Sequence, residues 1–354
     1  MDRSYALDNL RTITILSLFL FHACEIYHIG EGFFVEGQEQ LIPTMVYNFP
    51  SPWLMGVLFF IAGMTTVYSL RRRSVSEYYI NRLKTVLLPF VVGIVAWVPW
   101  ETYFVLKNHF DYDGSFLDAY IHYFTHYSEG FLGYDGGFTP SHLWFLIYLL
   151  IISFLCFPII RLIGTGKWDS LTFNSKWLVV LSFVIYIVAY GTTDESIGKF
   201  IVYFILGIIL AENKPYNEYI ISKWKVLIGL GIILNLISAY FLILMKNYPV
   251  VSVEYALMRL VWSIGNVVIT FGYLGMGKVL MSKSNPVMGY LSQRSFAIYF
   301  IHMPVLIATG YYVLEYIHIH YMLQIVTIIV ISFGITLGLV NVFKRIPVVS
   351  RLLF

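Results

Sequence analysis

Two ionisable side chains, Arg11 and His22, lie eleven residues apart in the first long apolar segment, LDNLRTITILSLFLFHA. On an α-helix, eleven steps of ~100° come within about 20° of three full turns, and a rise of ~1.5 Å per residue separates the two by roughly 16 Å. Both side chains are therefore expected on one face of one helix. A cation near one end of a membrane helix and an imidazole near its middle indicate a path that ends at a group able to exchange a proton.

The composition places this face in a lipid bilayer. Hydrophobic residues make up 58% of the chain and charged residues 12%, about half of the ~25% typical of soluble domains. The net charge of +3 is too small to argue for a nucleic-acid partner. The cysteines, Cys24 and Cys156, both fall in apolar segments, so we interpret them as buried thiols rather than as a disulfide or a metal site.

Apolar runs suited to crossing a bilayer recur along the whole chain. They predict an all-α fold, a polytopic membrane helical bundle of about ten transmembrane helices. The expected spans run approximately over residues 10–28, 52–70, 86–106, 143–163, 177–191, 199–212, 225–245, 256–280, 291–316 and 320–343. The fifth and sixth are short and are separated by the polar turn Thr192–Glu195, so one re-entrant pair is an alternative there.

The basic residues support this count independently. With the N- and C-termini both cytoplasmic, all but four of the 23 Lys and Arg residues fall on the inner side, as the positive-inside rule requires. The four on the outer side are Lys107, Lys199, Lys246 and Arg259. No internal repeat and no soluble domain are visible, so we expect one membrane domain over residues 1–354.

The longest connection is an outer loop at residues 107–141, in which aromatic and acidic residues alternate. Aromatic faces beside carboxylates suit stacking and hydrogen bonding to sugar rings, which makes Tyr123 and Tyr127 candidate substrate-binding residues. A lid that lies in the lipid headgroups is the alternative. His122 and His126 have a spacing that could hold a metal, but no acidic ligand set accompanies them, and we predict no metal site.

Five stretches of the chain carry a family resemblance. LDNLRTITILSLFLFH resembles the first helix of the acyltransferase-3 family of integral membrane O-acyltransferases, whose hallmark is an Arg and a His separated by ten residues. LFFIAGM resembles the family's FF-x-x-SG motif, and YYINRLKTVLLPF resembles its basic stretch before a proline. SHLWFLIYLL resembles its H-x-WFL motif, and YLSQRSFAIYFIHMPV resembles its SY-x-x-Y-x-x-H motif. The absence of an appended soluble domain is similar to the stand-alone branch that includes glucan-succinylating proteins.

The resemblance implies transfer of an acyl group, acetyl or succinyl, from cytosolic acyl-CoA to a hydroxyl of an acceptor on the outer side of the cell membrane, with a glycan favoured. Acyl-CoA is then a co-substrate, and no cofactor is bound. Its phosphates need a cationic surface on the inner face. Five residues could form it: Arg71, Arg72, Arg73, Arg82 and Lys84. The alternative for these residues is the topogenic role of positive charges in cytoplasmic loops.

His22 is the residue expected to carry the chemistry. A hydroxyl is a poor nucleophile at neutral pH, so transfer from a thioester needs a base that takes the acceptor's proton or a residue that is acylated first. Imidazole can do either, and Glu25, one turn further on, could orient it. Arg11 could clamp a phosphate or the pantetheine arm of the donor. A structural pair with Asp8, three residues earlier, is the alternative for Arg11.

Two further histidines are catalytic candidates. His142 opens the fourth expected span with Trp144 close by, and His302 lies about as deep in the ninth span as His22 does in the first. Comparable depth is what a shared intramembrane site requires. Tyr299, one turn before His302, could pair with it or, like Trp144, with substrate. A packing role is the alternative for each of these residues.

Two other classes of function stay open at this stage. One is a transporter or exporter with a polar intramembrane site, which should move its substrate unchanged and without CoA. The other is a non-catalytic scaffold, which should tolerate His22→Ala.

Overall fold

The structure is a computed structural model that describes residues 5–30, 32–130, 132–158, 171–190, 196–244, 249–283 and 285–354. Three sequence predictions lie outside these residues: the turn Thr192–Glu195, the outer Lys246, and residues 159–163 of the fourth expected span. The described residues form helices, apart from their connections and one isolated β-bridge between Tyr127 and Phe138. The all-α prediction is confirmed.

Each expected span coincides, in its described part, with a helix or a run of helices. These are α1 (Tyr5–Glu25), α3 (Leu54–Leu70), the run α4 (Val75–Arg82), η1 (Leu83–Leu87), α5 (Leu88–Ala96) and α6 (Pro99–His109), then α8 (Trp144–Leu155), α10 (Ser175–Ala189), α11 (Ile197–Leu210), α12 (Lys214–Leu244), α13 (Val253–Leu280), α15 (Ser295–Tyr316) and α16 (Tyr321–Phe343). The other described helices are short: α2 (Leu41–Asn48), α7 (Phe116–Thr125), η2 (Ser141–Leu143), α14 (Pro286–Ser292) and α17 (Pro347–Leu353).

Five of the described helices are long and apolar enough to cross a membrane: the run Val75–His109, α12, α13, α15 and α16. Shorter apolar helices lie at α3, η2–α8, α10 and α11. The most apolar stretches of α12 and α16 are only 28% buried inside the protein, whereas those of α13 and α15 are 78% buried. Apolar surface that the protein does not cover suits contact with lipid, so α12 and α16 have the character of peripheral membrane helices.

The contacts between residues group the chain into two compact units. Unit 1 consists of Met1–Thr14, Asn48–Tyr78 and Ile151–Gly289, and unit 2 of Ile15–Tyr47, Tyr79–Leu150 and Tyr290–Phe354. Each unit is therefore assembled from three separate stretches of sequence, and α1 passes from the first unit to the second between Thr14 and Ile15.

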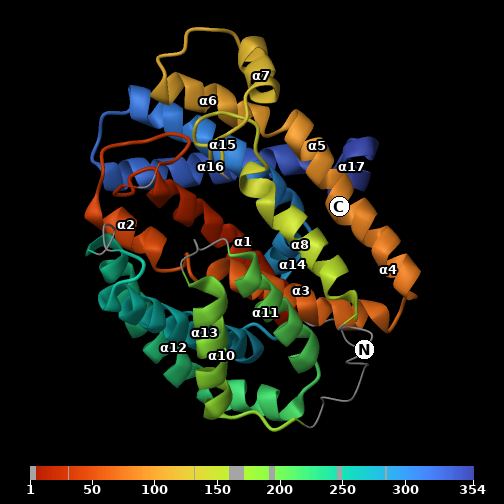
Figure 1. The fold of residues 1–354 in the computed structure, drawn as a ribbon. Coiled ribbons are helices and arrows are strands. Elements are labelled where there is room, and N and C mark those ends of the chain that lie inside the picture. Colours follow the sequence, from red (N-terminus) through yellow and green to blue (C-terminus); the bar gives the residue numbers. More distant parts are fainter. Residues whose placement is uncertain are drawn as a thin grey trace. The chain divides into compact units, whose positions relative to one another are not determined.

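Unit 1 is built on two closely packed helix pairs, α12 with α13 and α3 with α11 (Figure 1). The backbones of α3 and α11 touch at two glycines. A Cβ atom on Gly63 would lie 2.1 Å from the carbonyl oxygen of Phe204, and one on Gly207 would lie 2.1 Å from that of Phe60. Only glycine permits this approach, and small residues at helix crossings are typical of membrane bundles.

Unit 2 is centred on α15, which packs against both α16 and α6 (Figure 1). Pro304 lies inside α15 and has no backbone N–H, so the carbonyl of Phe300, four residues earlier, lacks its helical donor. The adjacent carbonyl of Ile301 accepts a hydrogen bond from Nε1 of Trp97, at 3.4 Å. Side chains from other elements thus reach the backbone of α15 at this point.

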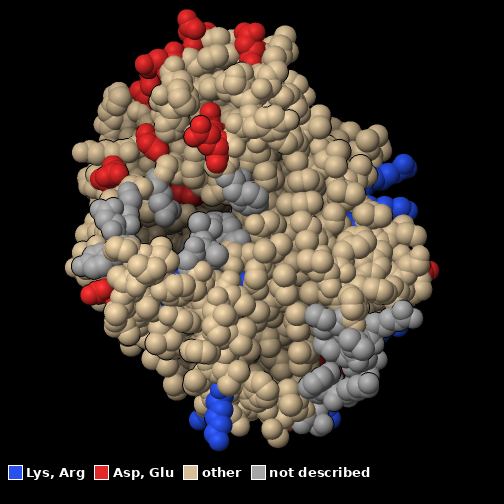
Figure 2. Space-filling view, in the orientation of Figure 1, with Lys and Arg blue, Asp and Glu red and all other residues tan. Residues whose placement is uncertain are grey.

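The charged surface of unit 2 is polarised. Figure 2 shows acidic side chains gathered over the turn between α6 and α7 and the start of α7. Asp111 and Asp113 are exposed in the turn, and Asp118 is exposed in α7. Basic side chains project where α17 packs against η1 and α5. Among the exposed cations of these elements and the adjoining turn are Lys84, Lys344, Arg345 and Arg351.

Candidate active site

Three histidines from three elements meet inside unit 2. They are His22 in α1, His142 in η2 and His302 in α15. The ring centroid of His302 lies 5.6 Å from that of His22 and 5.6 Å from that of His142. All three side chains are buried, and His302 is only 1% exposed. The structure therefore brings together the three histidines that the sequence singled out.

His22 is oriented by Glu25, one helical turn further along α1. Nδ1 of His22 lies 2.7 Å from a carboxylate oxygen of Glu25, and the hydroxyl of Tyr134 donates to the other carboxylate oxygen at 3.1 Å. With Nδ1–H donated to the carboxylate, Nε2 of His22 keeps its lone pair. Nε2 has no hydrogen-bond partner among the described residues. This nitrogen can act as a base or as a nucleophile.

Two connections cover the His22 ring within unit 2. Phe33 stacks on it, with ring centroids 6.0 Å apart and an interplanar angle of 11°, and His109 fixes Phe33 by donating from Nε2 to its carbonyl at 2.8 Å. Tyr134, from the loop at residues 107–141, packs its ring edge-to-face against Phe33. These aromatic rings limit the access of water to His22, and hydrogen bonds are stronger in such a low-dielectric setting.

His302 has a different set of contacts. Its Nδ1 lies 2.6 Å from the carbonyl oxygen of Tyr299, and because a carbonyl only accepts, Nδ1 carries the hydrogen. Nε2 of His302 is buried and has no hydrogen-bond partner among the described residues. The ring packs against Phe19 at 5.7 Å. A bare, buried nitrogen at the centre of the cluster is suited to accept a hydrogen bond from a bound hydroxyl.

His142 contacts a residue that the sequence reasoning missed, Glu101 in α6. Nδ1 of His142 lies 2.7 Å from one carboxylate oxygen of Glu101, and the hydroxyl of Ser141 donates to the other. Glu101 is 1% exposed. The available signal was that Glu101 is the only charged residue in the expected span 86–106, since an ionisable residue inside a membrane span usually has a functional partner.

The predicted cations are distributed over both units. Arg11, in the unit 1 part of α1, lies 3.4 Å from Asp8, the structural pair expected as the alternative. Arg71 forms an ion pair with Glu212 within unit 1, and Arg72 and Arg73 are exposed there.

In unit 2, Arg82 ends α4, and Lys84 is exposed on the π-helical turn η1. Pro89 follows this turn. Proline has no N–H and its ring crowds the carbonyl four residues earlier, here that of Thr85, and a π-helical turn is one way to relieve this. The turn is a local departure from α-helical geometry inside the basic stretch that the resemblance picked out.

The four aromatic candidates occupy different environments. Tyr299 is buried, and its hydroxyl donates to the carbonyl of His142 at 2.5 Å. Trp144, at the start of α8, is buried with its ring against Tyr148. Tyr123 is fully buried and donates to the carbonyl of Thr139 at 2.8 Å, so in this conformation it supports the loop from inside. Tyr127 is 86% exposed and open to a large partner.

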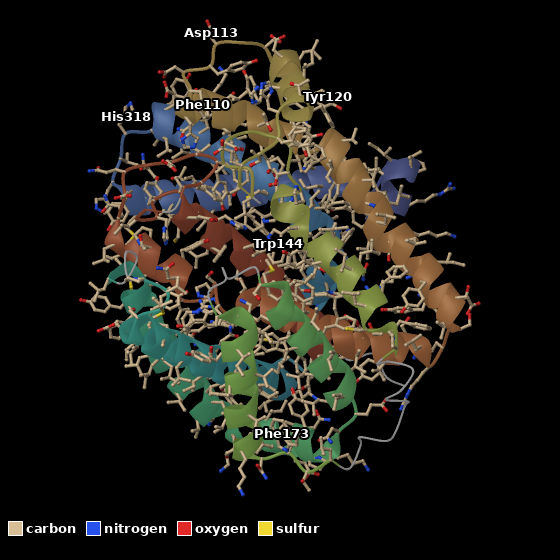
Figure 3. All side chains as sticks on the ribbon, viewed as in Figure 1. Phe110, Asp113, Tyr120, Trp144, Phe173 and His318 are labelled. Atoms are coloured by element: carbon tan, nitrogen blue, oxygen red, sulfur yellow. The ribbon has the colours of Figure 1, made fainter. Side chains whose placement is uncertain are left out.

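One end of unit 2 carries Phe110, Asp113 and Tyr120, and His318 from the connection between α15 and α16 lies at the same end (Figure 3). Helix α7 begins there with a capping box, in which Ser115 and Asp118 exchange side-chain-to-backbone hydrogen bonds. The hydroxyl of Ser115, and then its backbone N–H, donate to the Asp118 carboxylate and lower the pKa of Asp118. Asp118 is therefore held in the charged form.

His122 and His126 stack with ring centroids 3.9 Å apart on α7. Burial lowers the pKa of His122, the neighbouring His126 lowers it further, and Asp135 partly opposes the change. Within the described residues, no group of three or more His, Cys, Asp and Glu is arranged to hold a metal ion.

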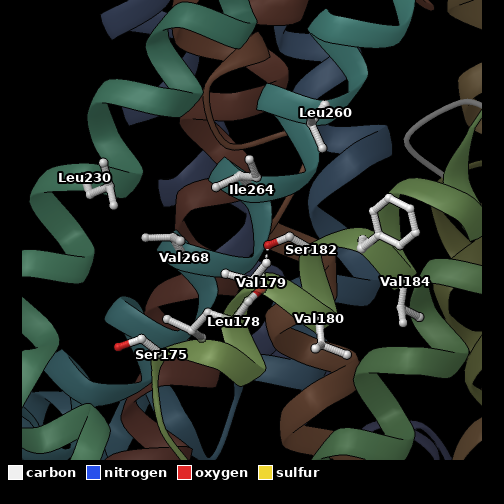
Figure 4. A pocket seen from close by; sticks show the side chains of 11 residues that line it. Ser175, Leu178, Val179, Val180, Ser182, Val184, Leu230, Leu260, Ile264 and Val268 are labelled. Atoms are coloured by element: carbon white, nitrogen blue, oxygen red, sulfur yellow. Dashed lines mark hydrogen bonds between the residues drawn. The ribbon is translucent and has the colours of Figure 1, made fainter.

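Unit 1 holds an apolar cavity of about 570 Å³ between α10, α12 and α13 (Figure 4). Most of its lining is aliphatic, and the hydroxyl of Ser182 donates to the carbonyl of Leu178 in its own helix. This cavity offers no ionisable group for acyl chemistry. The candidate active site is therefore the histidine cluster of unit 2.

The long apolar helices and the buried cluster of imidazoles and carboxylates define a polytopic membrane protein with a buried polar site. The chain belongs to the acyltransferase-3 family, because a family model described as an acyltransferase domain matches residues 4–341. It is thus an integral multi-pass membrane acyltransferase, which decides against the transporter and the scaffold. Comparison with curated proteins and with solved structures gives no match.

Proposed function

We propose that this enzyme moves an acetyl or succinyl group from cytosolic acyl-CoA to a hydroxyl of an acceptor on the outer side of the cell membrane, with a glycan as the favoured acceptor. One observation carries the proposal: Glu25 holds Nδ1 of His22, which leaves Nε2 available in a buried site of an acyltransferase. Acyl-CoA serves as a co-substrate, and the reaction needs no bound cofactor.

In this proposal His22 acts as the base. The acceptor hydroxyl oxygen attacks the thioester carbonyl carbon while Nε2 of His22 takes the hydroxyl proton. The C–S bond then breaks, sulfur leaves as the CoA thiolate, and the proton on His22 is available to neutralise it. Glu25 stabilises the imidazolium formed in between. The alternative is an acyl-histidine, in which Nε2 attacks the thioester first and the acceptor then takes the acyl group.

The donor and acceptor are assigned to opposite sides from the charges of unit 2. The cations Arg82 and Lys84, with Arg351 of α17, are proposed to bind the phosphates of acyl-CoA on the cytoplasmic side. Arg71, Arg72, Arg73 and Arg11, which belong to unit 1, are likewise proposed as donor-binding residues. Exposed Tyr127, in the acidic outer loop, is proposed to stack on the acceptor.

This layout rests on the proposed ten-span topology of one domain, with both termini cytoplasmic, and side-specific labelling tests it. Cysteines introduced at Gln38 and Asp118 should react with an impermeant maleimide from outside, and one introduced at Lys84 only from the cytoplasmic side. The native Cys24 and Cys156 are buried, which keeps the background low. Labelling of Asp118→Cys and Lys84→Cys from the same side would refute the layout.

The function itself is tested with purified protein in lipid, radiolabelled acetyl-CoA or succinyl-CoA, and a set of candidate glycans. We expect label to appear on a glycan hydroxyl together with one free CoA thiol for each transfer. A donor that is consumed only by hydrolysis, with every glycan tested, would contradict the proposed acceptor class.

A further inference from the structure

The pair formed by Glu101 and His142 differs from an ordinary buried ion pair in how its hydrogens are fixed. Nε2 of His142 lies 3.2 Å from the carbonyl oxygen of Phe300. That carbonyl is available because Pro304, four residues later in α15, has no N–H to donate. A carbonyl only accepts, so Nε2 of His142 carries a hydrogen.

The other nitrogen of His142 also has a hydrogen beside it. Nδ1 lies 2.7 Å from Oε1 of Glu101 in an ion-pair contact, and neither atom has a hydrogen-bond partner among the described residues. A carboxylate this close to an imidazole nitrogen favours the protonated form of the imidazole, so Nδ1 also carries a hydrogen. Oε2 of Glu101 accepts from the hydroxyl of Ser141. The pair thus has no net charge, which avoids an uncompensated carboxylate in the interior.

The groups packed around the pair favour this arrangement. The ring of His302 lies beside that of His142, with the hydrogen of His302 on Nδ1 and donated to the carbonyl of Tyr299. The hydroxyl of Tyr299 donates to the backbone carbonyl of His142. On the α7 side, the carboxylate of Glu101 lies near enough to Tyr123 to help raise the pKa of that phenol, after the larger effect of burial.

His142 therefore holds α15 at two neighbouring points. Its side chain donates to Phe300, and its backbone accepts from Tyr299. His302 follows directly after this segment, at the centre of the histidine cluster. A displacement of α15 here would move the bare Nε2 of His302.

We propose that Glu101 is a positioning residue for acyl transfer: it keeps a hydrogen on both nitrogens of His142, so that His142 fixes α15 and His302 instead of acting as a base. His302 is then left with a bare Nε2 that accepts a hydrogen bond from the acceptor hydroxyl beside His22. The inference rests on the proposed function for the identity of that hydroxyl.

The first test is spectroscopic and independent of turnover. The protein, with ¹⁵N-labelled histidine, is studied in lipid between pH 6 and pH 9, and its nine histidines keep the spectrum tractable. Both nitrogens of His142 should be of the N–H type throughout, whereas His302 should show one N–H and one bare nitrogen. The His142 signals are assigned by their loss in His142→Gln, or by their shift in Ser141→Ala if that variant does not fold.

The second test is kinetic. Glu101→Gln keeps the shape of the side chain but removes the charge that holds the second hydrogen on His142. Misplacing a reacting group by about 1 Å can cost up to ~100-fold, so for the smaller shift of His302 we expect kcat to fall about ten-fold at neutral pH with the KM for acyl-CoA unchanged. Activity should recover toward acidic pH, where the solvent supplies the missing proton. Glu218→Gln, the same change at an exposed site on α12, is the matched control.

The experiments distinguish a failure of this inference from a failure of the proposed function. A bare nitrogen on His142 in the wild type would overturn the proposal whatever the enzyme's substrate is. So would a Glu101→Gln variant that loses activity mainly at acidic pH, because that is the sign expected if His142 were the base. If the wild type transfers no acyl group at all, the proposed function fails, while the nitrogen measurement still decides the state of His142.

Discussion

The two carboxylate–imidazole pairs of unit 2 have the same contact distance and different chemistry. In both, Nδ1 lies 2.7 Å from a carboxylate oxygen, and in both a hydroxyl donates to the second oxygen. The two pairs differ at Nε2 of the histidine. In His22 this nitrogen has no hydrogen-bond partner among the described residues, whereas in His142 it donates to a backbone carbonyl. A carboxylate beside a histidine therefore does not define a base. What holds the second nitrogen decides whether the imidazole can take a proton.

The largest expected effect is at His22, because its free Nε2 is what distinguishes the first pair from the second. His22→Ala should cut acyl transfer at least ~100-fold, the lower range for loss of a positioned acid or base. Transfer of label from acyl-CoA by the variant in lipid measures this. His318→Ala, at an exposed position, is the control for loss of an imidazole. A well-folded His22 variant with near-normal turnover would remove the contrast between the pairs.

The second effect concerns Glu25, the partner in that pair. A hydrogen bond to a charged group contributes ~1.5 to 3 kcal/mol, so Glu25→Gln should lower kcat by about 10- to 100-fold. The loss should persist across the pH range, because a glutamine does not stabilise the imidazolium that forms during each turnover. The Glu101→Gln variant should differ, because its kcat should recover at acidic pH. Matching pH profiles for the two variants would mean that the pairs do the same work.

The sequence was sufficient to predict the contact between His22 and Glu25, but not the contact between His142 and Glu101. His22 and Glu25 are three residues apart on one helix, so helical periodicity alone places them together. Glu101 and Ser141 are separated by 40 residues, and their contact depends on how α6 packs in unit 2. The hydroxyl of Tyr134 reaches Glu25 across 109 residues, a contact that no local pattern encodes.

The fold, too, was predictable from the sequence only in part. The apolar runs predicted where the helices lie, because burial in lipid or in a core constrains composition over many residues. They did not predict the short α7, whose capping box at Ser115 was a readable signal, or the π-helical turn before Pro89. They also gave no sign that Tyr123 is buried while its neighbour Tyr127 is exposed.

A third prediction separates catalysis from donor binding. Arg82 belongs to neither carboxylate–imidazole pair, so Arg82→Ala should leave kcat nearly unchanged. A well-formed charged contact contributes ~1.5 to 3 kcal/mol, so we expect the KM for acyl-CoA to rise about ten-fold. Added salt should weaken wild-type donor binding in the same direction. Two-substrate kinetics provide both constants, with Lys107→Ala as the control on the acidic outer side. An Arg82 variant altered only in its acceptor dependence would reverse the proposed sides.

The smallest expected effect compares the two hydroxyls that complete the pairs. The Tyr134 hydroxyl donates to Glu25 and the Ser141 hydroxyl to Glu101, and a neutral donor of this kind contributes ~1 kcal/mol, or about five-fold. Tyr134→Phe keeps the ring that packs on Phe33 and removes the hydroxyl that donates to Glu25, so we expect kcat to fall about three- to five-fold. Ser141→Ala should cost less, because His142 still holds α15 through Phe300.

The Tyr134 variant also sharpens the comparison in a second way. Tyr134 lies in the middle part of the 107–141 loop, so acceptor bound against that loop can shift the hydroxyl that supports Glu25. Ser141 is fully buried where the loop ends and η2 begins, and bound acceptor has less effect on it. We therefore expect the loss in Tyr134→Phe to depend on which acceptor is used and the loss in Ser141→Ala to be the same for all acceptors. Measuring kcat for each variant with two acceptors of different size tests this. Equal ratios for both variants would show that the outer loop does not couple the acceptor to His22.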